Sequence, residues 1–300
     1  MKKIDAGSFW MLVAGLLFAC MGVLVKIGAQ KFTSTELVFY RSLFGLLAIL
    51  LVIGTGRGQL RTRHWRLHLS RSLLGFAALS LFFYAIANLP LATAITLNYT
   101  SPLFLAALAL VYLRKETRPV LVLAIVTGFC GVALLLQPSF SEGSWFPATM
   151  GLLSGLLAGI VYLQVTRLGR LGEPEWRTVF YFTLACTAGS GIWMLSNRFH
   201  SVSPDDCLLL GAMGACATLA QLAMTRAYRV GDPLVAGSLA YSTVVIASLL
   251  GILLWNETLS LLSWLGVAMI IASGVLSVRF SAQDRKITAD FDKSAQAHTL

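Results

Sequence analysis

The sequence predicts an all-α integral membrane protein with ten transmembrane helices, arranged as two inverted five-helix repeats. Three observations support this fold class: long apolar runs, basic residues that concentrate in the connections on one side, and a weak repeat between the two halves. Of the 300 residues, 57% are hydrophobic and only 12% are charged, whereas soluble proteins carry about 25% charged residues. The composition therefore places the chain in a lipid bilayer.

The apolar runs are each long enough to cross the hydrocarbon core, which takes about 20 residues at 1.5 Å per residue. They are continuous rather than alternating, so they favour helices over barrel strands. The expected spans are residues 8–29, 36–55, 68–88, 91–113, 119–137, 146–166, 175–195, 206–228, 231–255 and 259–280.

Most of the 23 Lys and Arg residues lie in the connections on one side of these spans, including Arg71 at the start of the third. Because basic residues concentrate in cytoplasmic loops, we expect both termini in the cytoplasm and the protein in the inner (cytoplasmic) membrane. The net charge of +10 arises from these loops rather than from a basic domain, so no nucleic-acid partner is expected. Residues 281–300 are polar and are expected to form a disordered cytoplasmic tail.

Four short segments recur in the same order in the two halves. GLLFACMGVLVK (15–26) aligns with GLLAGIVYLQVT (155–166), and LNYTSPLF (97–104) aligns with LAYSTVVI (239–246). The other two are a shared VFY, at 38–40 and 179–181, and the pair Glu116 and Glu257. Five helices in each unit place the second unit in the opposite orientation, as in secondary transporters. The expected repeats are residues 1–140 and 141–280.

Several residues carry a resemblance to a known family. They are Lys26, Arg41, the Glu-Thr pairs at 116–117 and 257–258, and the glycines of the helices that follow these pairs, Gly128, Gly131, Gly266 and Gly274. With these features the chain resembles the ten-helix, EamA-like branch of the drug/metabolite transporter superfamily. The resemblance implies export or exchange of small metabolites through a central cavity lined by helices 1, 3, 4, 6, 8 and 9. Arg41 aligns with Phe182, so its role is not duplicated.

Polar residues interrupt the fourth and ninth spans near the expected membrane centre. Thr96, Tyr99 and Thr100 recur in kind as Ser238, Tyr241 and Ser242, and the i, i+3, i+4 spacing puts each trio on one helix face. Inverted-repeat transporters build their binding sites at this depth. The alternative is that such side chains bond across packed helices.

Further positions extend this candidate site. Pro102 has no N–H to return to the carbonyl of Asn98, which leaves that oxygen free to bind a ligand. Tyr162 is expected at the membrane interface instead. The predicted substrate-binding residues are Thr96, Asn98, Tyr99, Thr100, Pro102, Ser238, Tyr241 and Ser242, with Tyr84 on the third span and Gln221 on the eighth.

Lys26, Glu36 and Arg41 lie around the first hairpin and are candidates for a gating or charge network. An unpaired cation within the bilayer costs at least about 2.5 to 3.5 kcal/mol, so Arg41 should have a partner or face water. Glu36 either supports the start of its helix, with Ser34 or Thr35 as the N-cap, or forms part of an outer gate.

The sequence favours a secondary transporter, an exporter or exchanger that works by alternating access. It shows no phosphate loop, no zinc-binding spacing and no carboxylate at the membrane centre, so we expect no enzyme activity, no cofactor and no metal. The positive charge near the outer side favours amino acids or related zwitterionic or anionic metabolites as substrates. The alternatives are a proton-coupled multidrug carrier, a carrier of nucleoside-like or vitamin-like metabolites, and a non-transporting membrane protein. The expected partners are the substrate, the lipid bilayer and at most a second copy of the chain, as monomer or homodimer.

Overall fold

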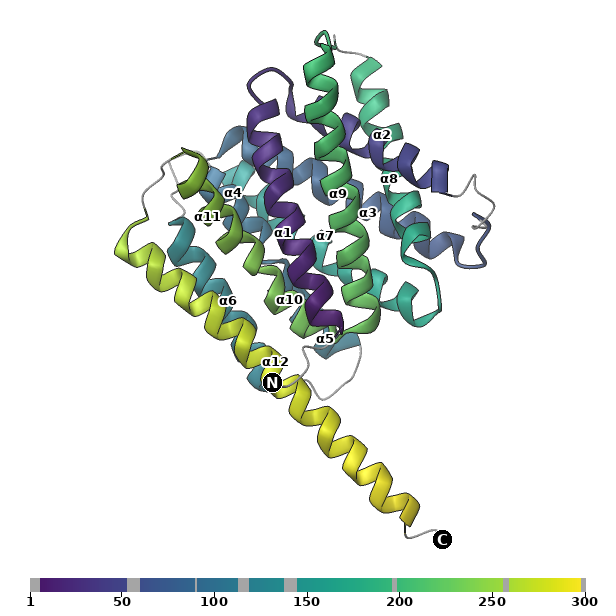
Figure 1. The fold of residues 1–300 in the computed structure, drawn as a ribbon, viewed down its shortest axis with the longest axis vertical. Coiled ribbons are helices and arrows are strands. Elements are labelled where there is room, and N and C mark those ends of the chain that lie inside the picture. Colours follow the sequence, from purple (N-terminus) through teal and green to yellow (C-terminus); the bar gives the residue numbers. More distant parts are fainter. Residues whose placement is uncertain are drawn as a thin grey trace.

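The computed structural model describes residues 6–52, 60–89, 91–112, 119–137, 145–195, 199–255 and 259–297. Within these residues all regular structure is helical. The helices (Figure 1) are α1 (Ala6–Gly28), α2 (Ser34–Val52), α3 (Trp65–Asn88), α4 (Leu91–Asn98), α5 (Ser101–Tyr112), α6 (Pro119–Leu136), α7 (Trp145–Arg170), α8 (Glu175–Leu195), α9 (Pro204–Val230), α10 (Pro233–Ala240), α11 (Ser242–Trp255) and α12 (Leu261–Ala297).

The helices α1 to α12 outnumber the ten expected spans because two of the spans are each divided into two helices. The ten expected spans are therefore confirmed. α4 and α5 make up the fourth span, and α10 and α11 make up the ninth. Among the described residues, nine helical stretches are long and apolar enough to cross a membrane, and the fourth span contributes a shorter apolar stretch at Ala94–Leu108. α1 begins and α12 ends toward the bottom of Figure 1, as an even number of spans requires.

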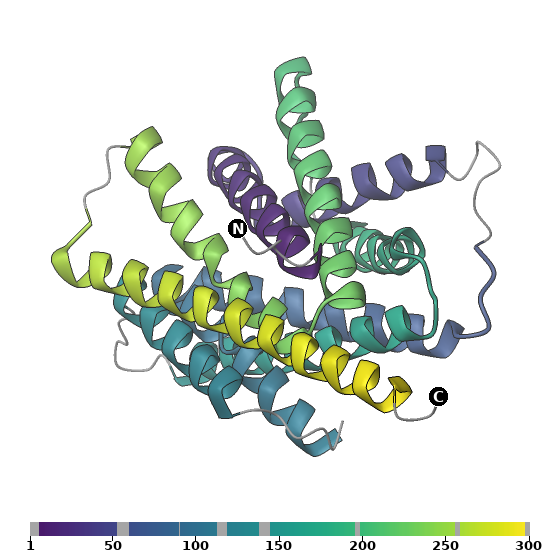
Figure 2. The ribbon, with the colours of Figure 1, turned by 60° about the horizontal axis from the view of Figure 1, so that its bottom comes forward.

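The helices pack in pairs that repeat between the two halves. α1 packs along α9, and the equivalent helices α7 and α3 pack along each other in the same way. α1 also contacts both parts of the ninth span, α10 and α11, and its equivalent α7 likewise contacts both parts of the fourth span. α2 packs on its equivalent α8, and α6 lies beside its equivalent α12 at one edge of the bundle (Figure 2). The contacts therefore follow a pseudo-twofold relation between the halves.

Both broken spans are interrupted at the tyrosines that the sequence analysis selected. In the fourth span the amide of Thr100 donates to the carbonyl oxygen of Leu97 at 3.2 Å, and Pro102 has no N–H to continue the α-helical pattern. In the ninth span the amide of Tyr241 donates to the carbonyl oxygen of Ser238 at 3.4 Å. These bonds close tighter, 3₁₀-type turns. The polar trios thus lie where two half-helices meet, and not on one uninterrupted helix face as the spacing predicts.

Two glycines allow α7 and α1 to approach these breaks closely. A Cβ atom at Gly155 in α7 would overlap Oγ1 of Thr100 and lie 2.8 Å from the carbonyl oxygen of Leu97. A Cβ atom at Gly15 in α1 would lie 2.9 Å from Oγ of Ser242. Gly15 aligns with Gly155, and Ser242 aligns with Thr100. Each half therefore makes the same close contact with the broken span of the other half.

The last helix is longer than the sequence predicts. α12 continues past Phe280 to Ala297, and its final part projects beyond the bundle (Figure 1), where we expected a disordered tail. Residues 281–297 contain neither Gly nor Pro, so no residue in this stretch terminates the helix. The Glu-Thr pairs at 116–117 and 257–258 lie outside the described residues.

Substitution of Gly155 tests whether the close contact at the first break stabilises the fold. We expect Gly155→Ala to lower the melting temperature in detergent, because a forced shift in a packed interior costs about 1 to 3 kcal/mol. Gly22→Ala is the matched control, since a Cβ atom at Gly22 would meet nothing within 4 Å. Equal melting temperatures for the two variants would contradict the proposed packing.

Candidate functional site

Tyr99 and Tyr241, one from each broken span, lie next to each other in the middle of the bundle. Their ring centroids are 6.2 Å apart, with the ring planes tilted by 35°. Gly128 in α6 makes room for the Tyr241 ring, because a Cβ atom there would lie 2.5 Å from ring atom Cδ2. The hydroxyl of Tyr99 hydrogen-bonds to the side chain of Thr243 in the opposite half. The two repeat-related tyrosines thus meet close to the pseudo-twofold axis.

Tyr162 of α7 and Tyr228 of α9 form a second pair beside the first. Their rings stack with centroids 4.9 Å apart and planes within 15°. Tyr228 lies within electrostatic range of both Tyr162 and Tyr241, so the two pairs form one group, which we call the tyrosine cluster. Tyr228 is not among the residues predicted from the sequence, and Tyr162 is predicted at the interface, because tyrosines near the basic end of a span are typical of the interface.

Several buried polar atoms at the tyrosine cluster have no hydrogen-bond partner within the described part of the chain. They include the hydroxyls of Tyr228 and Tyr241, which are 1% and 0% exposed, and Oγ of Ser242 at the second break. A buried polar group without a partner costs about 1 to 3 kcal/mol. These atoms are therefore available to bind a polar ligand in the centre of the bundle.

Arg71 of α3 places a buried positive charge beside the tyrosine cluster. Its side chain is 1% exposed, its guanidinium lies 4.1 Å from the centroid of the Phe182 ring, and it is within electrostatic range of Tyr162. Its Nε and Nη1 atoms have no hydrogen-bond partner among the described residues. From its place in the sequence, Arg71 is predicted to belong to the basic residues of the connections, whereas its side chain points into the protein.

Arg41 has a different kind of partner from Arg71. Its Nη1 atom lies 3.7 Å from Sδ of Met21, so a soft sulfur acceptor is the partner that the structure gives to this cation. Lys26 lies in the last turn of α1 and also interacts with another group of the protein. Cys186 of α8 lies within electrostatic range of both Arg41 and Arg71.

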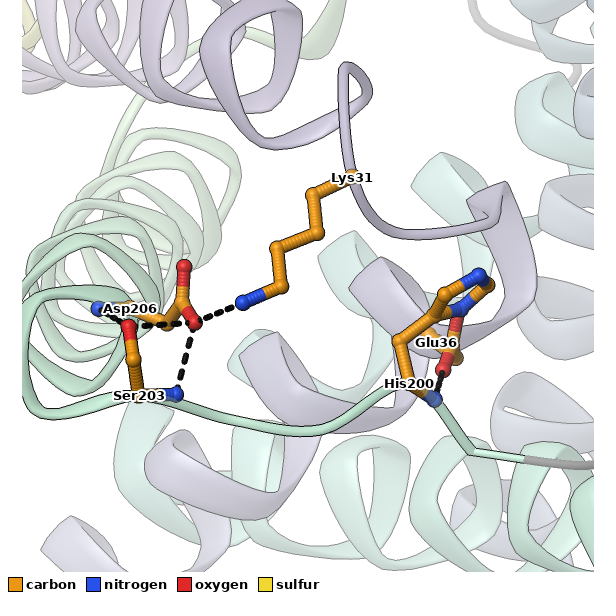
Figure 3. A network of polar contacts seen from close by, with 5 residues as sticks. All are labelled: Lys31, Glu36, His200, Ser203 and Asp206. Carbon is orange, nitrogen blue, oxygen red and sulfur yellow. Dashed lines mark hydrogen bonds and ion pairs between the residues drawn. The ribbon is translucent and has the colours of Figure 1, made fainter.

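Glu36 belongs to a polar network that joins the starts of α2 and α9 (Figure 3). Its carboxylate accepts from the amide and the hydroxyl of Thr33 at 2.7 and 2.9 Å, and the Glu36 amide donates to the Thr33 hydroxyl at 3.3 Å, which makes a capping box. The N-cap is thus Thr33, and not Ser34 or Thr35. The carboxylate also accepts from the amide of His200 at 2.7 Å and lies 2.9 Å from its Nδ1. The capping role expected of Glu36 is therefore observed, and the same carboxylate also links the two halves through His200; the outer gate stays a prediction.

A second capping box at the start of α9 completes this network. The Asp206 carboxylate accepts from the amide and hydroxyl of Ser203, both at 2.7 Å, and forms an ion pair with Lys31. The segment before α2 is therefore tied to α9, and the segment before α9 is tied to α2 (Figure 3). We call Lys31, Glu36, His200, Ser203 and Asp206 the α2–α9 clasp.

Glu173 forms a related cluster at the opposite end of the bundle, between α7 and α8. Its carboxylate lies 2.6 Å from Nη1 of Arg177 and 3.2 Å from Nε2 of His68, and it accepts from the hydroxyl of Thr62. Burial raises the pKa of Glu173, but the hydrogen bonds from Thr62 and Arg177, together with the nearby His68 ring, outweigh burial, so the pKa lies below its ordinary value. We call these four residues the Glu173 cluster.

Other predicted site residues take part in helix contacts. Nδ2 of Asn98 donates to Oγ of Ser154 in α7 at 3.0 Å. Oγ of Ser238 lies 3.1 Å from Ser273 Oγ and accepts from Ser277 at 2.8 Å, which is the helix-bonding alternative weighed from the sequence.

The remaining predictions divide between the interior and the surface. Thr96 and Gln221 are 6% and 7% exposed, and Thr100 donates to the carbonyl of Leu97 at 2.5 Å. Tyr84 is 41% exposed and packs edge-on against Phe146, with centroids 5.9 Å apart. It does not contribute to the tyrosine cluster.

The chain is similar to known transporters over nearly its whole length. It is 28% identical over 276 residues to the pseudopaline exporter CntI of Pseudomonas aeruginosa, covering 92% of this chain and 94% of that protein. It is 28% identical over 282 residues to a riboflavin transporter of Rhizobium johnstonii, covering 93% and 92%. A solved structure with 18% sequence identity covers 92% of this chain and 98% of its own chain, with a TM-score of 0.80, and so shares the fold.

The family match covers both halves separately. The EamA-like transporter family matches residues 5–137 and again residues 145–279, which together make up most of the chain. The chain belongs to the EamA-like transporter family.

Proposed function

We propose that this protein is a secondary transporter that exports or exchanges small anionic or zwitterionic metabolites, such as amino acids, across the inner membrane. The observation that carries the proposal is the group of unpartnered polar atoms in the tyrosine cluster, together with Arg71. Relatives are named as transporters of pseudopaline, riboflavin and S-adenosylmethionine. These are three different compounds, so the names of the relatives do not indicate one substrate class for this chain.

The charge of the site favours a negatively charged group on the substrate. Arg71 is buried with two N–H-bearing atoms unpartnered in the described chain, and a guanidinium binds a carboxylate through such donors. The half-helices α5 and α11 both begin at the breaks, and a helix N-terminus favours an anion. The aromatic faces of the cluster provide stacking surface for the rest of the substrate.

The positions of the acidic residues favour transport without proton coupling. Proton-coupled carriers commonly place an Asp, Glu or His within the membrane as a relay. Here the buried carboxylates of Glu36 and Glu173 lie near the ends of the bundle and are held by several donors. Glu36 is the residue on which the alternative of a proton-coupled carrier rests.

Alternating access is proposed because contacts between the halves tie both ends of the bundle. The α2–α9 clasp joins the second and eighth spans, and the Glu173 cluster joins the seventh and third. These pairs of spans are equivalent under the repeat, so each cluster is the counterpart of the other. Opening one while the other stays closed would expose the tyrosine cluster to one side at a time.

The orientation can be tested with a native cysteine. Cys207 is exposed in the first turn of α9, at the end of the bundle away from the termini, so we expect a membrane-impermeant maleimide to label it in intact cells. Cys130 is exposed in the middle of α6, on a face that lipid would cover and that a membrane-impermeant reagent does not reach. Cys207→Ser should abolish the labelling. Labelling of Arg63→Cys in intact cells, on the Cys207→Ser background, would refute the proposed orientation.

Transport can be tested in liposomes loaded with a pooled metabolite mixture. We expect release of anionic and zwitterionic compounds, measured by mass spectrometry, at the same rate with and without an imposed pH gradient. Release that requires the gradient would favour the proton-coupled alternative. No release above that of protein-free liposomes would favour a non-transporting membrane protein.

Arg71→Gln serves as the charge variant in the same assay. It should reduce release of carboxylate-bearing compounds by tenfold or more, since a hydrogen bond to a charged group contributes about 1.5 to 3 kcal/mol. The folded protein should remain as stable as the parent, because an unpaired buried cation is removed. Unchanged selectivity would exclude Arg71 from the site.

Removal of one hydroxyl tests the tyrosine cluster. Tyr241→Phe keeps the ring, so we expect an unchanged or higher melting temperature and a roughly tenfold loss of release, because the lost group has no partner in the folded chain. Tyr181→Phe is the matched control: its hydroxyl donates to the carbonyl of Leu60 at 3.0 Å, so this variant should lose stability and keep transport. A stability loss without a transport loss in Tyr241→Phe would place the substrate elsewhere.

A further inference from the structure

A basic hollow lies between the start of α3 and the end of α7. Its volume is about 610 Å³, and Arg63, Arg66 and Arg167 line it together with Trp65 and Ser70. Ser70 accepts a hydrogen bond from Nε2 of Gln164 at 3.0 Å, which joins the two helices beneath the hollow. The hollow therefore has a fixed floor and a rim of positive charge.

An apolar groove continues from this hollow along α3. Its volume is about 460 Å³, it shares Trp65, Arg66 and Ser70 with the hollow, and it extends past Leu69 to Leu73 and Leu74. Leu69 and Leu73 are 47% and 54% exposed. From Trp65 to Leu74 an α-helix rises by roughly 13 Å, so the groove covers a large part of one membrane leaflet. A polar end and an apolar end in line match the shape of a lipid.

The charge of the hollow is not neutralised by the protein. Within the described part of the chain, no carboxylate forms an ion pair with Arg63, Arg66 or Arg167, whereas Arg177 and Arg229 at the same end pair with Glu173 and Glu175. The Arg66 guanidinium lies 5.5 Å from the centroid of the Trp65 ring, and Trp65 is 53% exposed. Exposed tryptophan and arginine at the end of a span lie at the depth of the lipid headgroups.

We propose that this hollow and groove bind an anionic phospholipid. The phosphodiester lies among Arg63, Arg66 and Arg167, and one acyl chain follows Leu69 and Leu73 along α3. Basic pockets between transmembrane helices bind anionic headgroups in this way. The site lies apart from the tyrosine cluster and does not depend on the transport proposal.

The test is native mass spectrometry of the protein extracted from nanodiscs that contain equal amounts of phosphatidylglycerol and phosphatidylethanolamine. The parent protein should retain phosphatidylglycerol preferentially. The triple variant Arg63→Gln, Arg66→Gln, Arg167→Gln should lower that preference at least tenfold, since each basic residue near the membrane surface contributes roughly a fivefold factor. Should the triple variant not fold, each single variant should lower it by about fivefold.

A matched triple variant separates a specific site from general charge. Arg61→Gln, Arg170→Gln, Arg279→Gln removes the same charge from exposed residues that do not line the hollow, and it should keep the preference. An equal loss in both triple variants would overturn the proposal. Displacement of phosphatidylglycerol by soluble glycerol 3-phosphate would also overturn it, because it would identify the site as one for free phosphates.

Discussion

In a bilayer a helix can be broken only where protein covers the break, because lipid offers no partner for a free N–H or C=O group. The site of this transporter depends on that constraint. Gly155 and Gly15 bring α7 and α1 into contact with the two breaks, and Gly128 leaves space for the Tyr241 ring. A side chain at any of these glycines would separate the helices. The central tyrosines are therefore positioned by backbone packing on the opposite half, and not by their own helices alone.

Arg71 shows how a buried charge is tolerated in this setting. The aromatic face of Phe182 offsets part of its desolvation, but a ring supplies no carboxylate, in contrast to the ion pairs of Arg177 and Arg229. Phe182 aligns with Arg41 in the first half. The position that carries a cation in one repeat thus supports a cation in the other, so the two repeats differ in charge at this position although they share a fold.

The sequence was sufficient to predict the spans, the repeat and the mid-span position of Tyr99 and Tyr241, because hydropathy and polar residues at mid-span are local signals. The sequence was not sufficient to predict that Arg71 and Tyr228 lie in the interior of the bundle. Each lies near a span end among other basic residues, and only the tilt and rotation of α3 and α9 direct them inward. The exposed position of Tyr84 could not be predicted from the sequence either, nor could the helix contacts of Ser238 and Asn98. The spacing of residues along one helix does not specify which neighbouring helix each residue faces.

The two ends of the bundle carry similar polar clusters, which differ in the groups that donate hydrogen bonds to the central glutamate. Each cluster pairs a buried glutamate with a histidine: Glu36 with His200 and Glu173 with His68. The Glu36 carboxylate accepts hydrogen bonds from two backbone N–H groups. The partners of the Glu173 carboxylate are side chains, including a charged arginine. The Thr33 amide belongs to the same half as Glu36, whereas His200 reaches Glu36 from the other half. If the halves rock against each other, opening this end would therefore break the His200 contacts and the Lys31–Asp206 ion pair and leave both capping boxes intact.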